Sequence, residues 1–315
     1  MMSRIGNMFI MVLLLVTFVA AGCNEDKKKV AFGDTPTLGS INISVDESFK
    51  PVIDQQVAMY QMLYPGTKIN VQYKAEASCI KDFLNDTATR MIVITRPLLP
   101  KEEKFMIDSL QYIPPSAKIA SDAVALVVNI NSTDTAFTLT DIKARLQGKL
   151  RRDQPIVFDG LTATSAVRFI TDSILKGAAF DTTVVKAAKN SQAVLEYVAE
   201  NENAIGIVGI SWIGNPEEPK QVAMLKKVKL AYVQCDACTD KPFVKPVQQS
   251  ITTRRYPLVR GLYYVLKENY DGLGTGFSSF LKYEQGQLIF RRAYLKPVMD
   301  FNVRNVKVNQ TLPEN

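Results

Sequence analysis

The sequence contains no histidine among its 315 residues. This absence excludes Ser-His-Asp and Cys-His catalysis, HExxH metal sites and histidine general bases. The chain also lacks a G-x-S-x-G nucleophile motif and a cluster of metal-ligating residues. We therefore expect no enzyme, no metal centre and no cofactor.

Cysteine is scarce, with four in the whole chain. Cys235 and Cys238 stand in "QCDACTD", in a polar segment that follows the strand-like "KLAYV". A thioredoxin-like site would need the CxxC motif beside a βαβ unit, and two cysteines are too few ligands for structural zinc. We expect a structural disulfide, with two idle thiols as the alternative, rather than redox chemistry.

One long hydrophobic run is present, from Met8 to Val19, after the basic Arg4. It is shorter than the roughly 20 residues of a transmembrane helix and lacks a basic stop-transfer flank. Small residues then precede Cys23, a pattern that resembles a bacterial lipobox. We predict a lipoprotein signal peptide at residues 1–22 and a lipid on Cys23. A soluble exported protein cleaved at an A-x-A type site is the alternative.

Concentrated charge is missing as well. The formal net charge is +7, but the basic residues are scattered, whereas nucleic-acid binding needs a clustered basic stripe. Residues 23–37 are polar with no hydrophobic period, which predicts a tether. The remaining length suffices for two lobes of ordinary size.

Strand-like and helical patterns alternate from residue 41 onward. Apolar residues three and four apart predict helices, and short β-rich runs predict strands. A strand, helix, strand, helix, strand order implies a mostly parallel sheet. The expected strands are 41–45, 68–74, 90–98, 123–130, 155–159, 204–209, 229–233 and 254–267; the expected helices are 48–66, 77–86, 101–110, 138–148, 165–175, 184–203 and 275–294.

Three segments resemble the phosphate-binding solute receptors of ABC importers, a family of periplasmic binding proteins. "ISVDESFKP" places a hydroxyl residue and Phe at a helix start, and "AIGIVG" matches a recurrent family strand. "YPLVRGLYYVLK" followed by "FLKYEQGQLIFRRAYLKPV" matches the family's closing pattern. The likeness covers nearly all of the chain that follows the signal peptide.

The resemblance implies a type II periplasmic-binding-protein fold, with two α/β lobes joined by two crossover segments. Lobe I would comprise residues 38–120 plus 255–305, and lobe II residues 121–254. Such a receptor closes its lobes around a solute at the ends of the sheets, and a transporter recognises the closed form.

The resemblance identifies two candidate binding loops in lobe I of this sequence. Ser48 and Phe49 match the family's hydroxyl and Phe pair, and Ser78 stands at the start of the next helix. Free N–H groups and hydroxyls at helix starts suit an oxyanion. Serine is also a preferred helix cap, so capping by Ser48, Asp46 or Ser78 is the alternative.

The third matching loop precedes the helix in "FDGLTATSAVRFITDSIL". Thr164 and Ser165 keep the hydroxyls of the family's Ser-Gly-Thr turn, but its glycine is replaced. The family's upstream arginine is also absent, and Asp159 stands near its position. Arg168, one turn further, is a candidate substitute, with a solvated surface arginine as the alternative.

Arg96 is the sharpest departure from the family, because phosphate receptors commonly carry an acid at this position. Arginine cannot accept the proton of hydrogenphosphate, but it can bind an oxyanion in a bidentate manner. Pairing with a nearby acid, such as Asp46 or Glu76, is the alternative.

These features favour a monomeric, lipid-anchored, extracytoplasmic solute-binding protein in the cell envelope. Its expected partners are inorganic phosphate or a related anion, an ABC permease and, through the lipid, the membrane, but no nucleic acid. The alternative is a degenerate lipoprotein of the same fold that acts as a sensor or interaction scaffold without transport.

Overall fold

The computed structural model describes residues 33–160 and 164–301. Its compact unit begins at Asp34, inside the predicted tether, because Asp34 forms an ion pair with Arg90. The predicted signal peptide and Cys23 lie outside the described residues. Within the described ranges no helix is long and apolar enough to cross a membrane.

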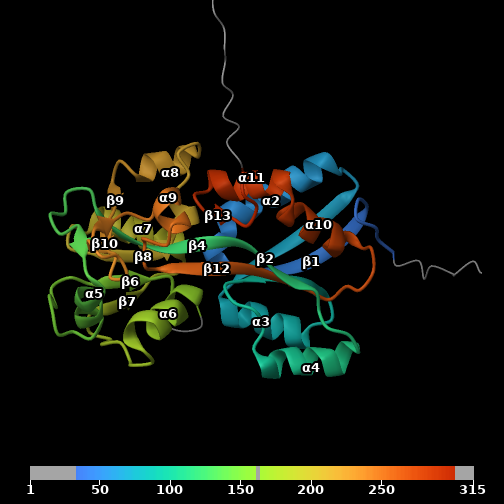
Figure 1. The fold of residues 1–315 in the computed structure, drawn as a ribbon, viewed down its shortest axis with the longest axis horizontal. Helices are drawn as coiled ribbons and strands as arrows, with labels where there is room; N and C mark the ends of the chain where they lie inside the picture. The colour runs from blue at the N-terminus through green and yellow to red at the C-terminus, as the bar shows by residue number, and fades with distance from the viewer. Residues whose placement is uncertain (1–32, 161–163, 302–315) are drawn as a thin grey trace, which may run out of the picture. The chain divides into compact units, whose positions relative to one another are not determined.

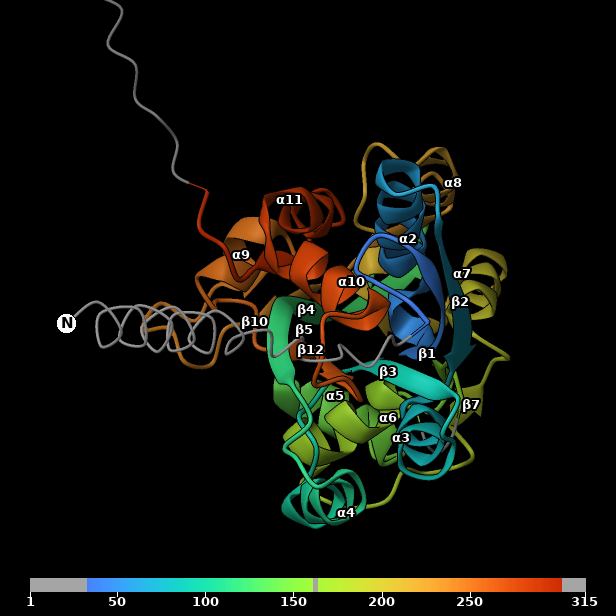
Figure 2. The same cartoon turned by 90° about the vertical axis from the view of Figure 1, so that its right-hand side faces the viewer.

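The first half of the main sheet has five strands in the order β2-β1-β3-β12-β4 (Figures 1 and 2). The first three are parallel, as the sequence predicts, and β12 pairs antiparallel with both β3 and β4. Their bounds are β1 (Gly39–Asp46), β2 (Thr67–Lys74), β3 (Thr89–Ile94), β12 (Val259–Leu266) and β4 (Ser116–Asn129).

Helices cover both faces of this half sheet, since alternate residues of β3 enter different cores. Met91 and Val93 join the large core under one set of helices, and Ile92 and Ile94 join the smaller core under the other. Figure 2 shows the two sets on opposite sides. One set is α2 (Lys50–Leu63), α10 (Leu273–Lys282) and α11 (Glu284–Arg292); the other is α3 (Glu76–Asn85) and α4 (Pro100–Leu110).

The long strand β4 links this half to a second one. Its pairing with β12 extends to Ala123, and from Val124 onward it pairs with β8 and β9. Strand β6 runs parallel to β8 and β7. The strands are β8 (Ile205–Gly209), β9 (Val228–Leu230), β6 (Ile156–Phe158) and β7 (Val185–Ala187), and the helices are α5 (Leu139–Leu146), α6 (Ser165–Ile170), η2 (Thr171–Leu175, a π-helical turn), α7 (Ser191–Glu200) and α8 (Pro219–Met224).

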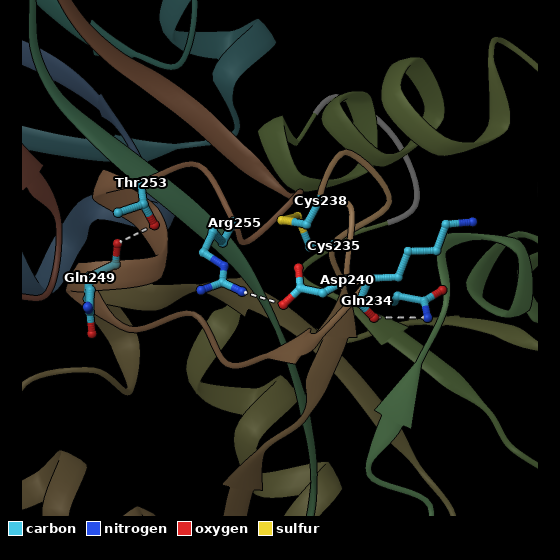
Figure 3. Close-up of a disulfide and its surroundings, with 8 residues drawn as sticks. Gln234, Cys235, Cys238, Asp240, Gln249, Thr253 and Arg255 are labelled. Atoms are coloured by element: carbon cyan, nitrogen blue, oxygen red, sulfur yellow. Dashed lines mark hydrogen bonds and ion pairs between the residues drawn. A yellow bond between two sulfur atoms is a disulfide. The ribbon is translucent and has the colours of Figure 1, made fainter.

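A small three-stranded sheet carries the disulfide between Cys235 and Cys238 (Figure 3). The bridge closes the turn between two of its strands, next to the ion pair of Arg255 with Asp240. The remaining elements are β5 (Ala136–Phe137), β10 (Tyr232–Gln234), β11 (Phe243–Val244), α9 (Gln248–Thr252), β13 (Lys296–Pro297), η1 (Glu47–Phe49) and η3 (Ile210–Trp212).

The structure is the mixed α/β architecture that the sequence predicts, with three local differences. The segment 184–203 is not one helix, because its start forms the edge strand β7 beside β6. The helix expected at 275–294 is two helices, broken at Tyr283. The strand expected at 229–233 is split at Ala231 into β9 and β10. The predicted lobe limits remain a prediction.

Candidate functional site

The first loop of the candidate site follows β1. Asp46 is buried at the strand end, and its Oδ1 accepts a hydrogen bond from the N–H of Ser48 at 3.0 Å. This cap starts the η1 turn, and Pro51 in the first turn of α2 suits a helix start. Ser48 and Phe49 are both fully buried. The expected capping role therefore belongs to Asp46, which leaves the Ser48 hydroxyl available for other contacts.

The loop before α6 meets the first loop directly. Thr164 caps α6, its Oγ1 accepting from the N–H of Val167 at 3.3 Å. Ser165 is fully buried, and its Oγ lies 3.2 Å from Oγ of Ser48. Residues 117 positions apart thus share a hydrogen bond across the junction of the two half sheets.

Arg260 of β12 joins these hydroxyls from a third direction. Its Nη1 donates to Oγ of Ser165 at 2.8 Å, and its Nε donates to Oδ2 of Asp122 at 2.8 Å. Arg260 and Asp122 are direct cross-strand partners in the β12–β4 ladder, and both side chains are almost fully buried. The guanidinium also stacks over the ring of Phe49, 5.2 Å from its centroid.

Several buried polar atoms of this cluster have no hydrogen-bond partner among the described residues. They are Nη2 of Arg260, Oδ1 of Asp122 and Oδ2 of Asp46. The carboxyl groups are not isolated. Burial raises the pKa of each, but the Ser165 hydroxyl opposes the rise in Asp46, and the N–H groups of Ala123 and Ile210 oppose it in Asp122. A Cβ built on Gly209 would lie 3.4 Å from Nη2 of Arg260, so the glycine lets β8 approach the guanidinium. Unsatisfied buried charged groups are costly and mark positions where a ligand can supply the missing bonds.

Burial governs the ionisation of the acids here. It raises the pKa of Asp46 to about 7, against the opposing effect of Arg260. Burial likewise raises the pKa of Asp122 and of Asp159, the latter opposed mainly by the Thr164 hydroxyl. Asp46 can therefore change protonation near neutral pH while Arg260 stays charged.

A second cluster crosses the same junction nearby, between Arg168, Glu76 and Thr95. Nε of Arg168 donates to Oε2 of Glu76 at 2.6 Å, and its Nη2 donates to Oγ1 of Thr95 at 2.7 Å. The N–H of Thr95 donates to Oε1 of Glu76 at 2.8 Å. Burial opposes ionisation of Glu76, but Arg168 and Thr95 outweigh it, so its pKa is lowered. Both Glu76 oxygens are bonded, so this cluster is complete without a ligand.

Two further contacts tie the halves together. Glu47 accepts hydrogen bonds from the N–H of Ser191 at 3.2 Å and from its hydroxyl at 2.7 Å, at the start of α7. Burial raises the pKa of Glu47 to about 6. The hydroxyl of Ser211 donates to the carbonyl oxygen of Ser48 at 2.8 Å. These hydrogen bonds join the two halves directly across the junction.

A groove of about 1070 Å³ opens from this junction to the surface. Asp46, Asp159 and Thr164 line it, so the groove reaches the buried cluster. Lys50 and Lys189 stand among its other lining residues. Among the described residues, five lysines and five acids line the groove, and Lys50 is paired with Asp54. The groove therefore gives a solute a route to the cluster without a net charge of its own.

Two predicted site residues stand apart from the cluster. Arg96 forms a bidentate pair with Glu102, at 2.7 and 2.8 Å, so its partner is neither Asp46 nor Glu76. Ser78 lies half-buried inside α3, its N–H bonded to the carbonyl oxygen of Ala75. The groups brought together are Ser48, Phe49, Thr164 and Ser165, with Arg168 in the second cluster.

Sequence reasoning missed the ion pair that organises the site. Asp122 stands directly before the apolar run "AVALVV", and Arg260 interrupts the aromatic and aliphatic strand "YPLVRGLYYVLK". Buried charges must be paired, so two opposite charges in two buried strands were a signal that those strands are neighbours. Among the described residues no group of three or more acids and cysteines could hold a metal ion.

The fold, with its groove at the junction of the two halves, is that of a two-lobed, type II periplasmic-binding protein. We call this groove, together with the buried cluster that it reaches, the cleft. The family model described as "PBP superfamily domain" matches residues 30–284. Since this match spans well over half of the chain, the protein belongs to the PBP superfamily. Comparison with curated proteins returns no match.

Solved structures of similar fold include proteins described as phosphate receptors as well as the regulatory domain of CcmR from Synechocystis, with a TM-score of 0.51 at 9% identity, covering 77% of this chain and 95% of its own. A protein assigned as a phosphate ABC transporter substrate-binding protein of Clostridium perfringens, with bound phosphate, has a TM-score of 0.66 at 20% identity, covering 83% of this chain and 100% of its own. An ABC-type phosphate transport receptor of Vibrio cholerae has a TM-score of 0.59 at 18% identity, covering 81% and 99%. PstS of Borrelia burgdorferi has a TM-score of 0.51 at 15% identity, covering 83% and 99%. At these identities the likeness concerns the fold.

Proposed function

We propose that this protein is an extracytoplasmic solute-binding protein that captures a protonated tetrahedral oxyanion, phosphate above all, for an ABC importer. The observation that carries this proposal is the convergence of Ser48, Ser165 and Arg260 from separate segments, with Nη2 of Arg260 buried and unpartnered within the described residues. The phosphate receptors of similar fold give independent support.

The donors of the site suit an oxyanion. Arg260 offers a free N–H beside two serine hydroxyls, and charge-assisted bonds from arginine to phosphate are strong. In this structure the hydroxyls of Ser48 and Ser165 bond to each other. A bound solute would lie between the two hydroxyls and accept a hydrogen bond from each. Binding therefore replaces one direct hydrogen bond between the lobes with two hydrogen bonds to the anion.

Asp46 supplies the acceptor that Arg96 cannot. The Oδ2 of Asp46 is buried without a partner among the described residues, and above its pKa of about 7 the carboxylate is ionised. An ionised acid accepts a hydrogen bond from hydrogenphosphate but repels sulfate, which has no proton to donate. We infer that the role assigned to the family's acid after the third strand has moved to the first loop.

Calorimetry at pH 8 with an anion panel tests the proposal. We expect phosphate and arsenate to bind, and sulfate, molybdate and small carboxylates to bind more weakly at the cleft. Ser165→Ala should weaken phosphate binding about tenfold, since it removes a hydrogen bond to a charged group. Ser109→Ala, on the exposed side of α4, is the matched control and should bind as the unmodified protein does.

Absence of binding to every anion of the panel would contradict the receptor proposal. That outcome would favour the scaffold alternative. We propose no chemical transformation of the solute.

We further propose that the protein is anchored in the cell envelope by a lipid on Cys23. This rests on the sequence pattern before Cys23 alone. Metabolic labelling with palmitate should mark the unmodified protein and leave Cys23→Ala unlabelled. Equal labelling of both would contradict the anchor at this residue.

A further inference from the structure

A second cavity, of about 420 Å³, lies beside the two predicted lobe crossings. Lys118 and Ser121 of β4 line it at the first crossing, and Arg254 and Tyr256 line it at the second. Cys235 of the disulfide turn adds to the wall. The volume lies within the range of about 300–1,000 Å³ typical of small-molecule sites. Arg260, the cation of the cleft cluster, also lines this cavity. The side chains of Lys118 and Arg254 take no part in the hydrogen bonds of the cleft cluster.

Two cations without an ion pair among the described residues line this cavity, and a third lies close to Lys118. Lys296 stands opposite Ser121 in the β13–β4 ladder, and Lys118 and Arg254 are on the cavity wall. Burial lowers the pKa of Lys118, and the charges of Arg254 and Lys296 lower it further. Like charges held together in a half-buried position destabilise the fold unless a counter-charge is bound.

No ion pair neutralises these three side chains within the described residues. The neighbouring Arg255 shows the contrast, because it pairs with Asp240 at 3.2 Å (Figure 3). Asp236 is the acid on the cavity wall, and it forms no ion pair with the cations. The local charge therefore remains positive.

The backbone fixes Arg254 at this position. Its φ is 57°, in the left-handed region that side chains disfavour. Its N–H donates to the carbonyl oxygen of Ile251 at 3.2 Å, which closes the turn after α9. The turn that ends α9 therefore places Arg254 at the cavity wall.

We propose that this cavity is a second anion-binding site, adjacent to the cleft cluster through the shared wall residue Arg260, for a compact oxyanion of two or more negative charges. Lys118, Arg254 and Lys296 are its donors. Because its walls come from both lobe crossings, a bound anion favours the lobe arrangement in which these cations lie together.

Sulfate at pH 8 is the probe, since the ionised Asp46 makes the cleft unfavourable for it. Calorimetry should show one sulfate bound by the unmodified protein and by Ser48→Ala/Ser165→Ala alike. Lys118→Met/Arg254→Asn should weaken that binding at least about tenfold, because two charged donors are lost. Asparagine tolerates the left-handed conformation, so the turn is preserved. Lys68→Met, an exposed lysine of β2, is the control and should not change sulfate binding.

Unchanged sulfate affinity in Lys118→Met/Arg254→Asn would overturn the second site, and so would the absence of sulfate binding by the unmodified protein. The two proposals fail differently when phosphate is titrated. If the cleft does not bind, the remaining phosphate binding is insensitive to Ser48→Ala/Ser165→Ala but lost in Lys118→Met/Arg254→Asn. If the second site does not bind, the reverse pattern holds.

Discussion

Two arginine clusters bridge the halves of this protein, and they differ in completeness. Around Arg168, both oxygens of Glu76 are bonded, and the site needs nothing more. Around Arg260, one guanidinium nitrogen and oxygens of Asp46 and Asp122 remain buried without partners among the described residues. A complete cluster can hold two lobes together, whereas an incomplete one can hold a ligand. Both clusters lie at the junction of the two halves, so location alone does not distinguish a cluster that joins the lobes from one that binds a ligand. The number of buried polar atoms without a hydrogen bond distinguishes them.

The largest expected effect comes from breaking the incomplete cluster. Arg260→Met leaves Asp122 buried without its partner, which should cost about 3–5 kcal/mol of unfolding free energy. Phosphate binding at the cleft should be lost, since the cation of the cluster is removed. Calorimetry in the Lys118→Met/Arg254→Asn background measures this loss without binding at the second proposed site. Denaturant unfolding measures the stability.

A paired variant separates stability from binding. In Arg260→Met/Asp122→Leu no charge is stranded, so much of the lost stability should return, but binding should not. Phosphate affinity close to that of the unmodified protein in this double variant would show that Arg260 does not hold the solute.

The next effect concerns Asp46 and is visible in pH dependence. Its pKa is raised from 3.8 to about 7 by burial, so the folded protein binds this proton more tightly than the unfolded chain does. The associated stabilisation is present below pH 4 and disappears as the pH rises to about 7. The unfolding free energy without solute should therefore fall over this range, and fall less in Asp46→Asn.

Binding gives Asp46 a second readout. At pH 8 the unmodified protein should prefer phosphate to sulfate at the cleft, whereas Asp46→Asn should lose most of this preference because an amide can donate to sulfate. The competition is best measured in the Lys118→Met/Arg254→Asn background, which removes the second proposed site. An unchanged preference would place the selectivity elsewhere.

A smaller effect should follow from opening the complete cluster. Arg168→Gln removes the bonds to Glu76 and Thr95, and the closed form should lose about 1–3 kcal/mol relative to an open one. Small-angle scattering should show a larger radius of gyration without phosphate and recovery when phosphate is added. Arg255→Gln, which removes an exposed pair with Asp240, is the control. If Arg168→Gln lost as much phosphate affinity as Arg260→Met, the proposed difference in function between the two clusters would be wrong.

Local signals predicted most of the fold. The helical spacing and β-rich runs identify the parallel strands β1, β2 and β3 and their helices, because each pattern depends on neighbours in sequence. The prediction of a helix from residue 184 was wrong. Val185–Ala187 forms its backbone hydrogen bonds with β6 at the edge of the sheet instead, and this pairing depends on residues distant in sequence. The helical spacing of apolar residues continues through Tyr283, so it did not predict the break between α10 and α11.

The candidate site was predictable to a smaller extent. Ser48 and Ser165 are selected by the resemblance of their loops to those of phosphate receptors. The helix-start signature alone favours capping equally well. Their contact, and the part played by Arg260 and Asp122, depend on strand order, which brings residues 138 positions apart into one ion pair. A single sequence does not specify that order.

The smallest effect is expected at Arg96, the residue that sequence reasoning placed at the site. Glu102 holds its guanidinium in a bidentate pair at the start of α4 and also accepts from the N–H of Leu99. The pair is partly exposed, so Arg96→Gln should cost up to about 1 kcal/mol of stability and change phosphate affinity less than twofold. Because Arg96 and Arg260 carry the same charge, calorimetry on the two variants tests whether pairing, rather than residue type, decides which arginine binds. A tenfold loss in Arg96→Gln would mean that its pair with Glu102 opens to meet the anion.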